Sequence, residues 1–251
     1  NVPLSDEDIN AIEFAAITLR QFEEIPLFND FGGTVDKIFQ AINIGTALDF
    51  EELRQIIQFE KSPKMQGVEY LEMLLQCIKE EKPVRFEYQK FGLKESKAHL
   101  VHPYLVKEYR NRWYLIGKQD SNDLITTYAL DRMDEPEPTK EVTFKKPLDF
   151  DSKAYFKHSF GITAFPGEPE EVILSFEPFQ GRYVQTQKLH ETQEEIQGDG
   201  NDYRIRLKVG ITIELEMAIL SYGEKVRVIK PDSLKERINE RLEAALNKYQ
   251  K

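Results

Sequence analysis

The chain has one cysteine, one tryptophan and no apolar stretch long enough to cross a membrane. A single thiol cannot form an internal disulfide, so a reducing, cytoplasmic environment is expected. No basic-then-apolar leader is visible near the N-terminus. Cys77 falls on the apolar face of a predicted helix, and we interpret it as buried filler rather than as a nucleophile.

The sequence also lacks the common signatures of catalysis. It contains no serine nucleophile elbow, no zinc-binding helix and no glycine-rich nucleotide loop, and Gly32-Gly33 is not followed by Gly-Lys-Ser/Thr. The four histidines show no metal-ligand spacing. We therefore expect no enzymatic activity, no metal site and no cofactor. These histidines are His99, His102, His158 and His190.

Positive charge is scarce and unevenly placed. The formal net charge is −10, which argues against a chain that coats nucleic acid along its whole length. Residues 79–134 hold 11 basic and 9 acidic side chains, whereas residues 1–78 hold 5 basic and 14 acidic. A small local excess of cations indicates a local anion site rather than a long phosphate-tracking surface.

Helical spacing dominates the first third of the chain. Apolar residues recur at helical intervals over 4–22, where Ser5 and Asp8 form a capping pattern, and over 68–79. Two further helices are predicted over 35–41 and 50–59. We assign residues 1–80 to a helical linker or dimerisation segment.

From Pro83 onward the apolar period changes to two. Extended runs over 84–88, 98–109, 112–118 and 125–132 predict short antiparallel strands that form a compact barrel over residues 81–138. Glu135-Pro136-Glu137-Pro138 is interpreted as a stiff, polar linker that closes this unit. Residues 139–167 are mixed in character and are taken as a connecting segment.

The last part of the chain, residues 168–251, alternates strands and helices. The predicted order is strand 171–177, helix 178–185, strand 188–196, strand 203–209, helix 213–222, strand 225–229 and helix 233–249, with a turn at Gly198–Asn201. Ser233 and Glu236 suggest a capping box, and Gly223 a left-handed helix end. The β-α-β-β-α-β-α order predicts a ferredoxin-like domain, so the fold class is α+β.

Two β-like runs carry the candidate site. In the first, Trp113 and Leu115 share one face and Arg112 and Tyr114 share the other; in the second, Tyr128 and Arg132 share a face. If the runs pair, both arginines lie near one edge, where two guanidiniums can hold an anion and the tyrosines can stack or donate a hydrogen bond. His102 and Tyr104 are further candidates, although a histidine before proline is more often structural.

The pattern alone leaves a second interpretation equally open. Arg132 can instead pair with Asp131 or Glu108 and serve only to close the barrel. Phe86 and Tyr88 can form a stacking platform, although core packing is the simpler assignment for Phe86.

The ordered residues around these runs resemble a known family. Arg112-Trp113-Tyr114-Leu115, followed by Leu130-Asp131-Arg132 and preceded by His102-Pro103-Tyr104 and Lys107-Glu108-Tyr109, resembles the WYL family of bacterial transcription regulators. Gly223, Val226-Arg227-Val228 and Pro231 are similar to the C-terminal extension that accompanies WYL domains. The resemblance implies an Sm-like, SH3-type barrel followed by that extension.

The resemblance also implies a function. It suggests a sensor that binds an anionic effector, a nucleotide or a short single-stranded nucleic acid, and acts as a homodimer. Promoter DNA would be contacted only through a helix-turn-helix expected to lie outside this chain. Where many members carry additional arginines, this sequence has Thr126 and Ala129, so a thinner anion site is expected. The alternative is a protein–protein interaction or oligomerisation domain with no small-molecule ligand.

Overall fold

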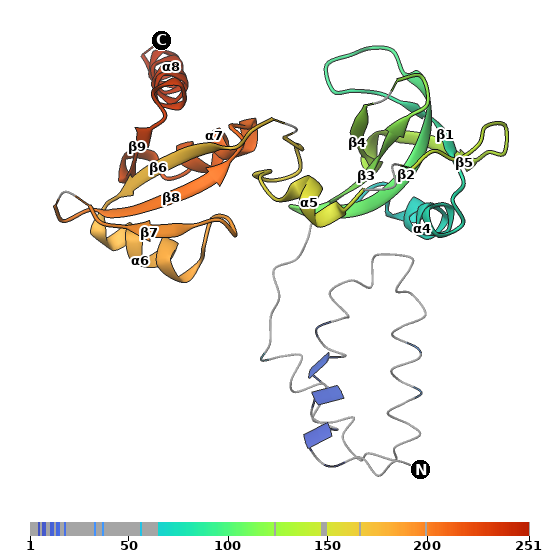
Figure 1. Ribbon diagram of the computed structural model, residues 1–251, viewed down its shortest axis with the longest axis horizontal. Helices are drawn as coiled ribbons and strands as arrows, with labels where there is room; N and C mark the ends of the chain where they lie inside the picture. Colours follow the sequence, from blue (N-terminus) through green and yellow to red (C-terminus); the bar gives the residue numbers. More distant parts are fainter. Residues whose placement is uncertain are drawn as a thin grey trace. The chain divides into compact units, whose positions relative to one another are not determined.

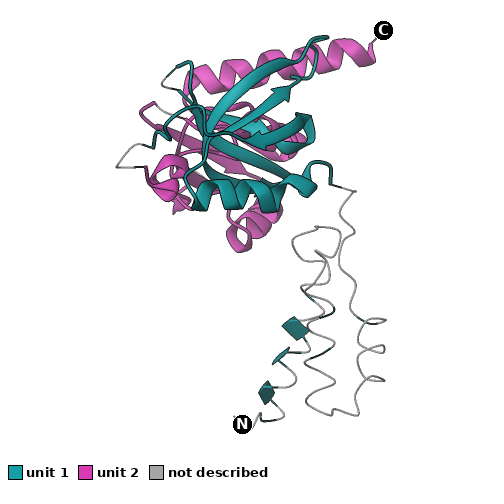
Figure 2. Ribbon diagram, turned by 90° about the vertical axis from the view of Figure 1, so that its right-hand side faces the viewer, with its two compact units in different colours: residues 1–146 teal, residues 147–251 magenta. Residues whose placement is uncertain are grey.

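The computed structural model describes residues 65–250 except 123, 147–149, 166 and 199, together with scattered residues before 65. The chain divides into two compact units, residues 1–146 and 147–251, coloured separately in Figure 2. Helices are predicted over 4–22, 35–41 and 50–59, but only scattered residues of these ranges are described, so the helices as a whole lie outside the described residues. The expected Ser5–Asp8 capping pair is present, because each backbone N–H donates to the other side chain, at 2.9 and 3.2 Å.

The first unit contains an antiparallel five-stranded sheet (Figure 1). Its strand order is β4-β3-β2-β1-β5, so β4 and β5 are the edge strands and closure into a barrel stays a prediction. The sheets of both units are combined with helices, which confirms the α+β class. The strands are β1 (Val84–Tyr88), β2 (Lys97–Tyr109), β3 (Arg112–Gln119), β4 (Ile125–Ala129) and β5 (Met133–Pro138).

The core of this unit forms where helix α4 (Leu71–Lys79), which follows the 3-10 turn η2 (Val68–Tyr70), packs on the sheet. Alternation along β1 buries every second residue, as the period of two predicts. Leu115 is fully buried and Trp113 packs against the same cluster, so both occupy the core as expected. Cys77 is also buried there, and burial raises the pKa of its thiol, which fits the interpretation as inert filler.

The predicted linker at 135–138 is wrong, because these residues belong to strand β5. Strand β5 pairs with β1, and the register shifts between Arg85 and Glu87, where Glu135 has a φ of +45°. Proline cannot donate to a strand ladder, but an edge strand with a bulge tolerates it. The prolines therefore marked an edge strand, and its pairing with β1 is not visible in local composition.

The strand predicted over 125–132 is three residues too long. It ends at Ala129 and continues as the 3-10 turn η3 (Leu130–Arg132), so Arg132 does not follow the alternation of the strand. Leu130 is fully buried at the start of this turn, and Gly67 approaches its backbone closely. A Cβ on Gly67, whose φ is +80°, would lie 2.4 Å from the Leu130 carbonyl group. Glycine is therefore required at position 67.

The second unit is built on an antiparallel four-stranded sheet with order β7-β8-β6-β9. Figure 1 shows the strands and helices of this unit. Side chains from helices α6, α7 and α8 share one core with the sheet. The observed order of strands and helices is the predicted one. The elements are α5 (Ser152–Phe156), β6 (Glu170–Phe176), α6 (Pro178–Thr186), β7 (Glu194–Ile196), β8 (Tyr203–Val209), α7 (Ile213–Leu220), η4 (Gly223–Lys225), β9 (Val226–Lys230) and α8 (Asp232–Tyr249).

Some local predictions for this unit need correction. Strand β7 is shorter than the predicted 188–196, because the Gln193 side chain accepts from Leu189 N–H at 2.8 Å and donates to the Val184 carbonyl at 3.0 Å. The capping box at Ser233 is absent, because the helix begins at Asp232 with no side-chain cap. Gly223 does adopt a positive φ, of 58°, as predicted. Among the described residues, no helix has the length and apolar character to span a bilayer.

Candidate functional site

A hollow of about 630 Å³ lies between the β1–β2 loop and the chain around η3. The loop is tied to this chain by Gln89, whose N–H donates to the Arg132 carbonyl at 3.2 Å and whose side-chain amide donates to the Leu93 and Lys94 carbonyls. The volume lies in the range of small-molecule sites. The charged lining residues are three cations, Lys90, Lys94 and Arg132, and three carboxylates, Glu87, Asp131 and Asp134.

Arg132 is the central cation of this hollow. Its guanidinium carbon lies 4.6 Å from the ring centroid of Phe91 and 5.7 Å from that of Tyr88. These distances are typical of cation–π contacts. The Phe91 side chain is 68% exposed, so the ring that Arg132 contacts remains open to solvent.

Arg112 converges on the same place from the start of β3. Its Nε lies 3.8 Å from Asp131 Oδ2, while Arg132 Nε lies 3.5 Å from Asp131 Oδ1. Its guanidinium carbon is also 5.9 Å from the Phe91 ring centroid. The structure therefore brings together the two arginines that the sequence singled out, and they share one carboxylate.

This shared carboxylate satisfies the arginines only partly. Arg132 Nε and Asp131 Oδ1 are both buried atoms, and neither has a hydrogen-bond partner among the described residues. An ion pair at 3.5 Å without a hydrogen bond is weak compared with a charge-assisted hydrogen bond of about 2.8 Å. The two guanidiniums share Asp131 as their only carboxylate partner among the described residues, although Glu87 and Asp134 also line the hollow. This arrangement can bind an anion at modest cost.

The two tyrosines of the predicted site are placed differently from the arginines. Tyr128 is 1% exposed, and its ring packs at 5.2 Å centroid distances on Phe86, Tyr88 and His99. Burial raises the pKa of the Tyr128 phenol to about 12. Tyr128 therefore lies in the aromatic core and does not line the hollow. Tyr114 is half-buried and lies near Tyr88, whose phenol has a raised pKa mainly because of burial, with Tyr114 as a lesser cause.

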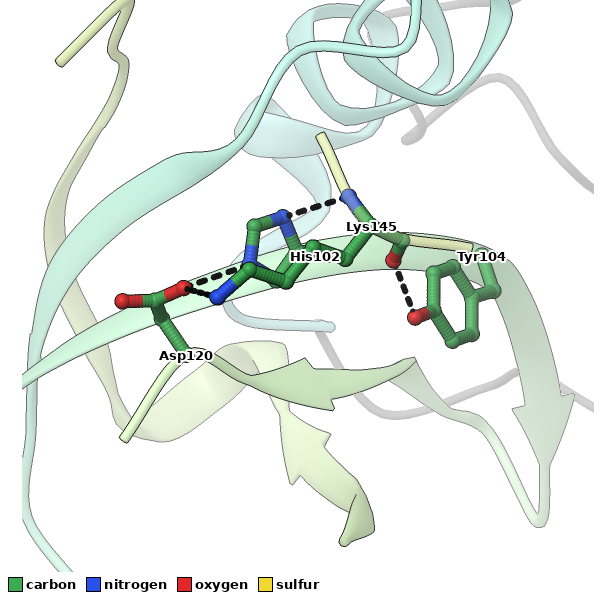
Figure 3. Close-up of polar contacts among 4 residues, drawn as sticks. All are labelled: His102, Tyr104, Asp120 and Lys145. Carbon is green, nitrogen blue, oxygen red and sulfur yellow. Dashed lines mark hydrogen bonds and ion pairs between the residues drawn. The ribbon is translucent and has the colours of Figure 1, made fainter. Parts of the chain in front are cut away.

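His102 lies in a separate polar cluster, shown in Figure 3. Its side chain is fully buried; Nδ1 accepts the N–H of Lys145 at 3.2 Å, and Nε2 lies 3.0 Å from Asp120 Oδ1. Because Nδ1 accepts, Nε2 carries the proton and donates to Asp120. Lys145 Nζ also donates to Asp120 Oδ1, at 2.6 Å. These hydrogen bonds from Lys145 and His102 lower the pKa of the Asp120 carboxyl.

Tyr104 completes this cluster. Its hydroxyl donates to the Lys145 carbonyl, and burial raises the pKa of the phenol to about 12 (Figure 3). Phe144 packs against the rings of both His102 and Tyr104, at 5.6 and 6.1 Å. His102 and Tyr104 thus attach residues 144–145 to strand β2, which is the structural role that a histidine before proline suggested. None of the residues of this cluster lines the hollow around Arg132.

Three residues of the hollow come from a loop that the sequence did not single out: Lys90, Phe91 and Lys94. All lie in Lys90-Phe91-Gly92-Leu93-Lys94, a turn in which Gly92 has a φ of +84° and Leu93 N–H donates to the Lys90 carbonyl. Two large apolar side chains between lysines are unusual in an exposed turn. This unusual composition was the signal in the sequence that could have pointed to the loop.

The described residues contain no group of three histidine, cysteine or acidic side chains arranged to hold a metal ion. What the hollow offers is a guanidinium, two lysines, an exposed ring and opposing carboxylates. This chemistry suits binding and orientation of a charged, planar molecule.

Comparison with known proteins gives matches in both units. The family model of the WYL domain matches residues 69–138, and that of the WCX domain matches residues 168–246. Among solved structures, proteasome accessory factor B/C (PafBC) of Arthrobacter aurescens is 20% identical over 70% of this chain, with a TM-score of 0.33. The chain spans 27% of the PafBC chain.

A second solved structure, of a CRISPR Cas-related protein, is 13% identical, with a TM-score of 0.46. The match covers 100% of this chain and 75% of the other. No curated protein sequence matches the chain.

Proposed function

We propose that this chain, which belongs to the WYL-domain family of transcription regulators, is a sensing module. Its hollow around Arg132 would bind an anionic effector. Arg132 would hold the anionic group, helped by Arg112, Lys90 and Lys94. The exposed ring of Phe91 would support a planar part of the ligand. A nucleotide or a short single strand has both features.

One observation carries this proposal: two arginines from different elements share a single, poorly bonded carboxylate at the edge of an open hollow. Structural arginines in proteins are usually matched by hydrogen-bonded partners, because an unsatisfied charged group is costly to bury. Here the Arg132 side chain is 21% exposed and contacts an aromatic ring that solvent can reach. An incoming anion would find both charge and a stacking surface.

The test is a titration of nucleoside monophosphates and short oligonucleotides against the chain and two variants. Arg132→Ala should weaken binding at least tenfold, since a hydrogen bond to a charged group contributes about 1.5–3 kcal/mol. Arg85→Ala is the matched control, because Arg85 lies in the same unit but pairs with Glu141 and does not line the hollow. Equal binding by Arg132→Ala and the wild type would remove Arg132 from the site.

The family also suggests how binding would be read out. We propose that effector binding shifts the arrangement of two subunits and so the spacing of DNA-binding units outside this chain. The ligand must then prefer one arrangement over the other. Binding of promoter DNA through a helix-turn-helix elsewhere in the protein, and the homodimer itself, belong to this proposal.

We also propose the finer fold descriptions. The adjacency of β5 and β1 supports an Sm-like barrel, and the order β7-β8-β6-β9 supports a ferredoxin-like second unit. We also propose the domain division into residues 1–80, 81–138, 139–167 and 168–251.

A second candidate function is an oligomerisation surface without a small-molecule ligand. The observation that favours it is the last part of α8, where Leu242, Leu246 and Tyr249 continue the apolar stripe of the helix but are 47%, 56% and 91% exposed. Sedimentation of wild type and Leu242→Asp/Leu246→Asp would test it. If the dimer persists in the variant, this surface does not hold it together.

A further inference from the structure

Two carboxylates of the hollow face each other across neighbouring strands. Glu87 on β1 is the register partner of Asp134 on β5, and both line the hollow. Like charges directly opposite each other destabilise an antiparallel pair. Neither carboxylate forms an ion pair with a described residue, although Lys90, Lys94 and Arg132 line the same hollow. The pair therefore costs stability at a point where the chain also forms its candidate binding site.

The charges around the hollow are balanced rather than positive. Three cations and three carboxylates line it, so a strand of many phosphates gains little from entering. A groove that tracks a phosphate backbone presents cations in excess. The volume of about 630 Å³ suits one compact ligand.

We propose that the Glu87–Asp134 pair accepts a hydrogen-bond donor of a nucleotide-sized ligand whose ring lies on Phe91 and whose single anionic group lies against Arg132. The inference rests on the proposed anion site and adds the ligand class, which is planar, singly phosphorylated and amino-bearing. Carboxylates accept hydrogen bonds only, so a donor on the ring is held and a carbonyl at the same place is repelled. The same pair repels any additional phosphate.

The experiment compares three probes: cytidine monophosphate, uridine monophosphate and a ten-nucleotide deoxycytidine strand. The two monophosphates have the same charge and differ in one ring substituent, an amino donor against a carbonyl acceptor. Wild type should bind cytidine monophosphate at least about fivefold more tightly than uridine monophosphate. A hydrogen bond to a charged group contributes about 1.5–3 kcal/mol, and competition from water at an open site reduces that contribution. The strand should bind no tighter than cytidine monophosphate, with a shallow salt dependence.

The deciding variant is Glu87→Gln/Asp134→Asn, with Glu95→Gln as its matched control. Glu95 lies in the same loop region but does not line the hollow. The double variant should bring the two monophosphates within about twofold of each other and should strengthen binding of the strand, because two repelling charges are removed. The control should change neither ratio. Thermal denaturation should show the double variant folded and at least as stable as wild type.

The outcomes separate this inference from the proposed function. If Arg132→Ala weakens binding but the double variant leaves the cytidine-to-uridine ratio unchanged, the ligand class is wrong and the anion site stands. A strand that binds wild type more than tenfold tighter than cytidine monophosphate, with a steep salt dependence, also overturns the ligand class. If no probe binds in a manner that depends on Arg132, both proposals fail.

Discussion

The two polar clusters of the first unit differ in how completely their hydrogen-bonding groups are satisfied. Around His102, both ring nitrogens, the Asp120 carboxylate and the backbone of Lys145 all have partners at hydrogen-bond distances. Around Arg132, one carboxylate is shared by two arginines at 3.5 and 3.8 Å, and the atoms of the closer pair make no hydrogen bond.

This difference indicates which cluster stabilises the fold and which is available to a ligand. A hydrogen-bonded cluster built on a fully buried side chain, such as His102, is expensive to disturb and leaves that side chain no capacity for another partner. An open, partly satisfied cluster gains from a ligand. The sequence placed His102, Tyr104, Arg112 and Arg132 in one pocket, and the structure divides them between these two clusters.

The largest expected effect is a loss of stability when the hydrogen-bonded cluster around His102 is disrupted. His102→Ala should lower the free energy of unfolding of the first unit by about 2–4 kcal/mol, because it leaves a cavity where the buried ring was and removes the acceptor of the Lys145 N–H. Urea denaturation measures this. His102→Gln is the matched variant, since its amide can both accept from Lys145 and donate to Asp120, and it should recover part of the loss. A folded His102→Ala protein that no longer binds nucleotides would place His102 in the site instead.

The next effect concerns alkaline pH. Burial raises the pKa of Tyr104 and Tyr128 to about 12, above the usual value near 10. A raised folded-state pKa contributes stability that is fully present below pH 10 and is lost as the pH rises from 10 to 12. The midpoint of urea unfolding should therefore fall over this window, and it should fall less steeply in Tyr128→Phe. An unchanged slope in that variant would mean that Tyr128 ionises as freely in the folded chain as in the unfolded one.

A smaller effect is expected from removing the carboxylate that the two arginines share. Asp131→Asn should raise the affinity for a nucleoside monophosphate by about threefold to tenfold, because the ligand no longer competes with Asp131 for Arg112 and Arg132. Isothermal titration calorimetry measures the change. Asp120→Asn, in the satisfied cluster, is the control and should leave affinity unchanged. A loss of affinity in Asp131→Asn would show that Asp131 positions the arginines rather than competing with the ligand.

The smallest effect is the stability change in Arg132→Ala. Its ion pair with Asp131 is long and the residue is partly exposed, so the free energy of unfolding should fall by less than about 1 kcal/mol. Chemical denaturation with Arg85→Ala in parallel measures this. A loss comparable to that in His102→Ala would make Arg132 a structural residue and remove the contrast between the clusters.

Most of the fold could be predicted because local patterns determine it. The alternation in Val84–Tyr88 and the helical spacing in Leu71–Lys79 mark buried faces directly. The β5 strand could not be predicted, because its pairing with β1 is a long-range interaction and its prolines favour a linker. The end of β4 at Ala129 depends on tertiary contacts of Leu130 in the same way.

The site was predicted only in part, for a related reason. Strand pairing could bring Arg112 and Arg132 together, and they do converge on Asp131. The loop that completes the hollow could not be placed from spacing, because loop position depends on bonds such as that from Gln89 to the Arg132 carbonyl. The side-chain direction of Tyr128 could not be predicted either, because a strand tyrosine can face the core or solvent, and here it faces the core.

The most direct test of the division between the clusters is a nuclear magnetic resonance titration of the chain with cytidine monophosphate. Backbone amide signals from residues 89–96 and 130–134 should shift with a common dissociation constant, while those of His102, Asp120 and Lys145 stay in place. Arg132→Ala should abolish the shifts. Shifts centred on His102 and Lys145, with the loop signals unmoved, would contradict the account.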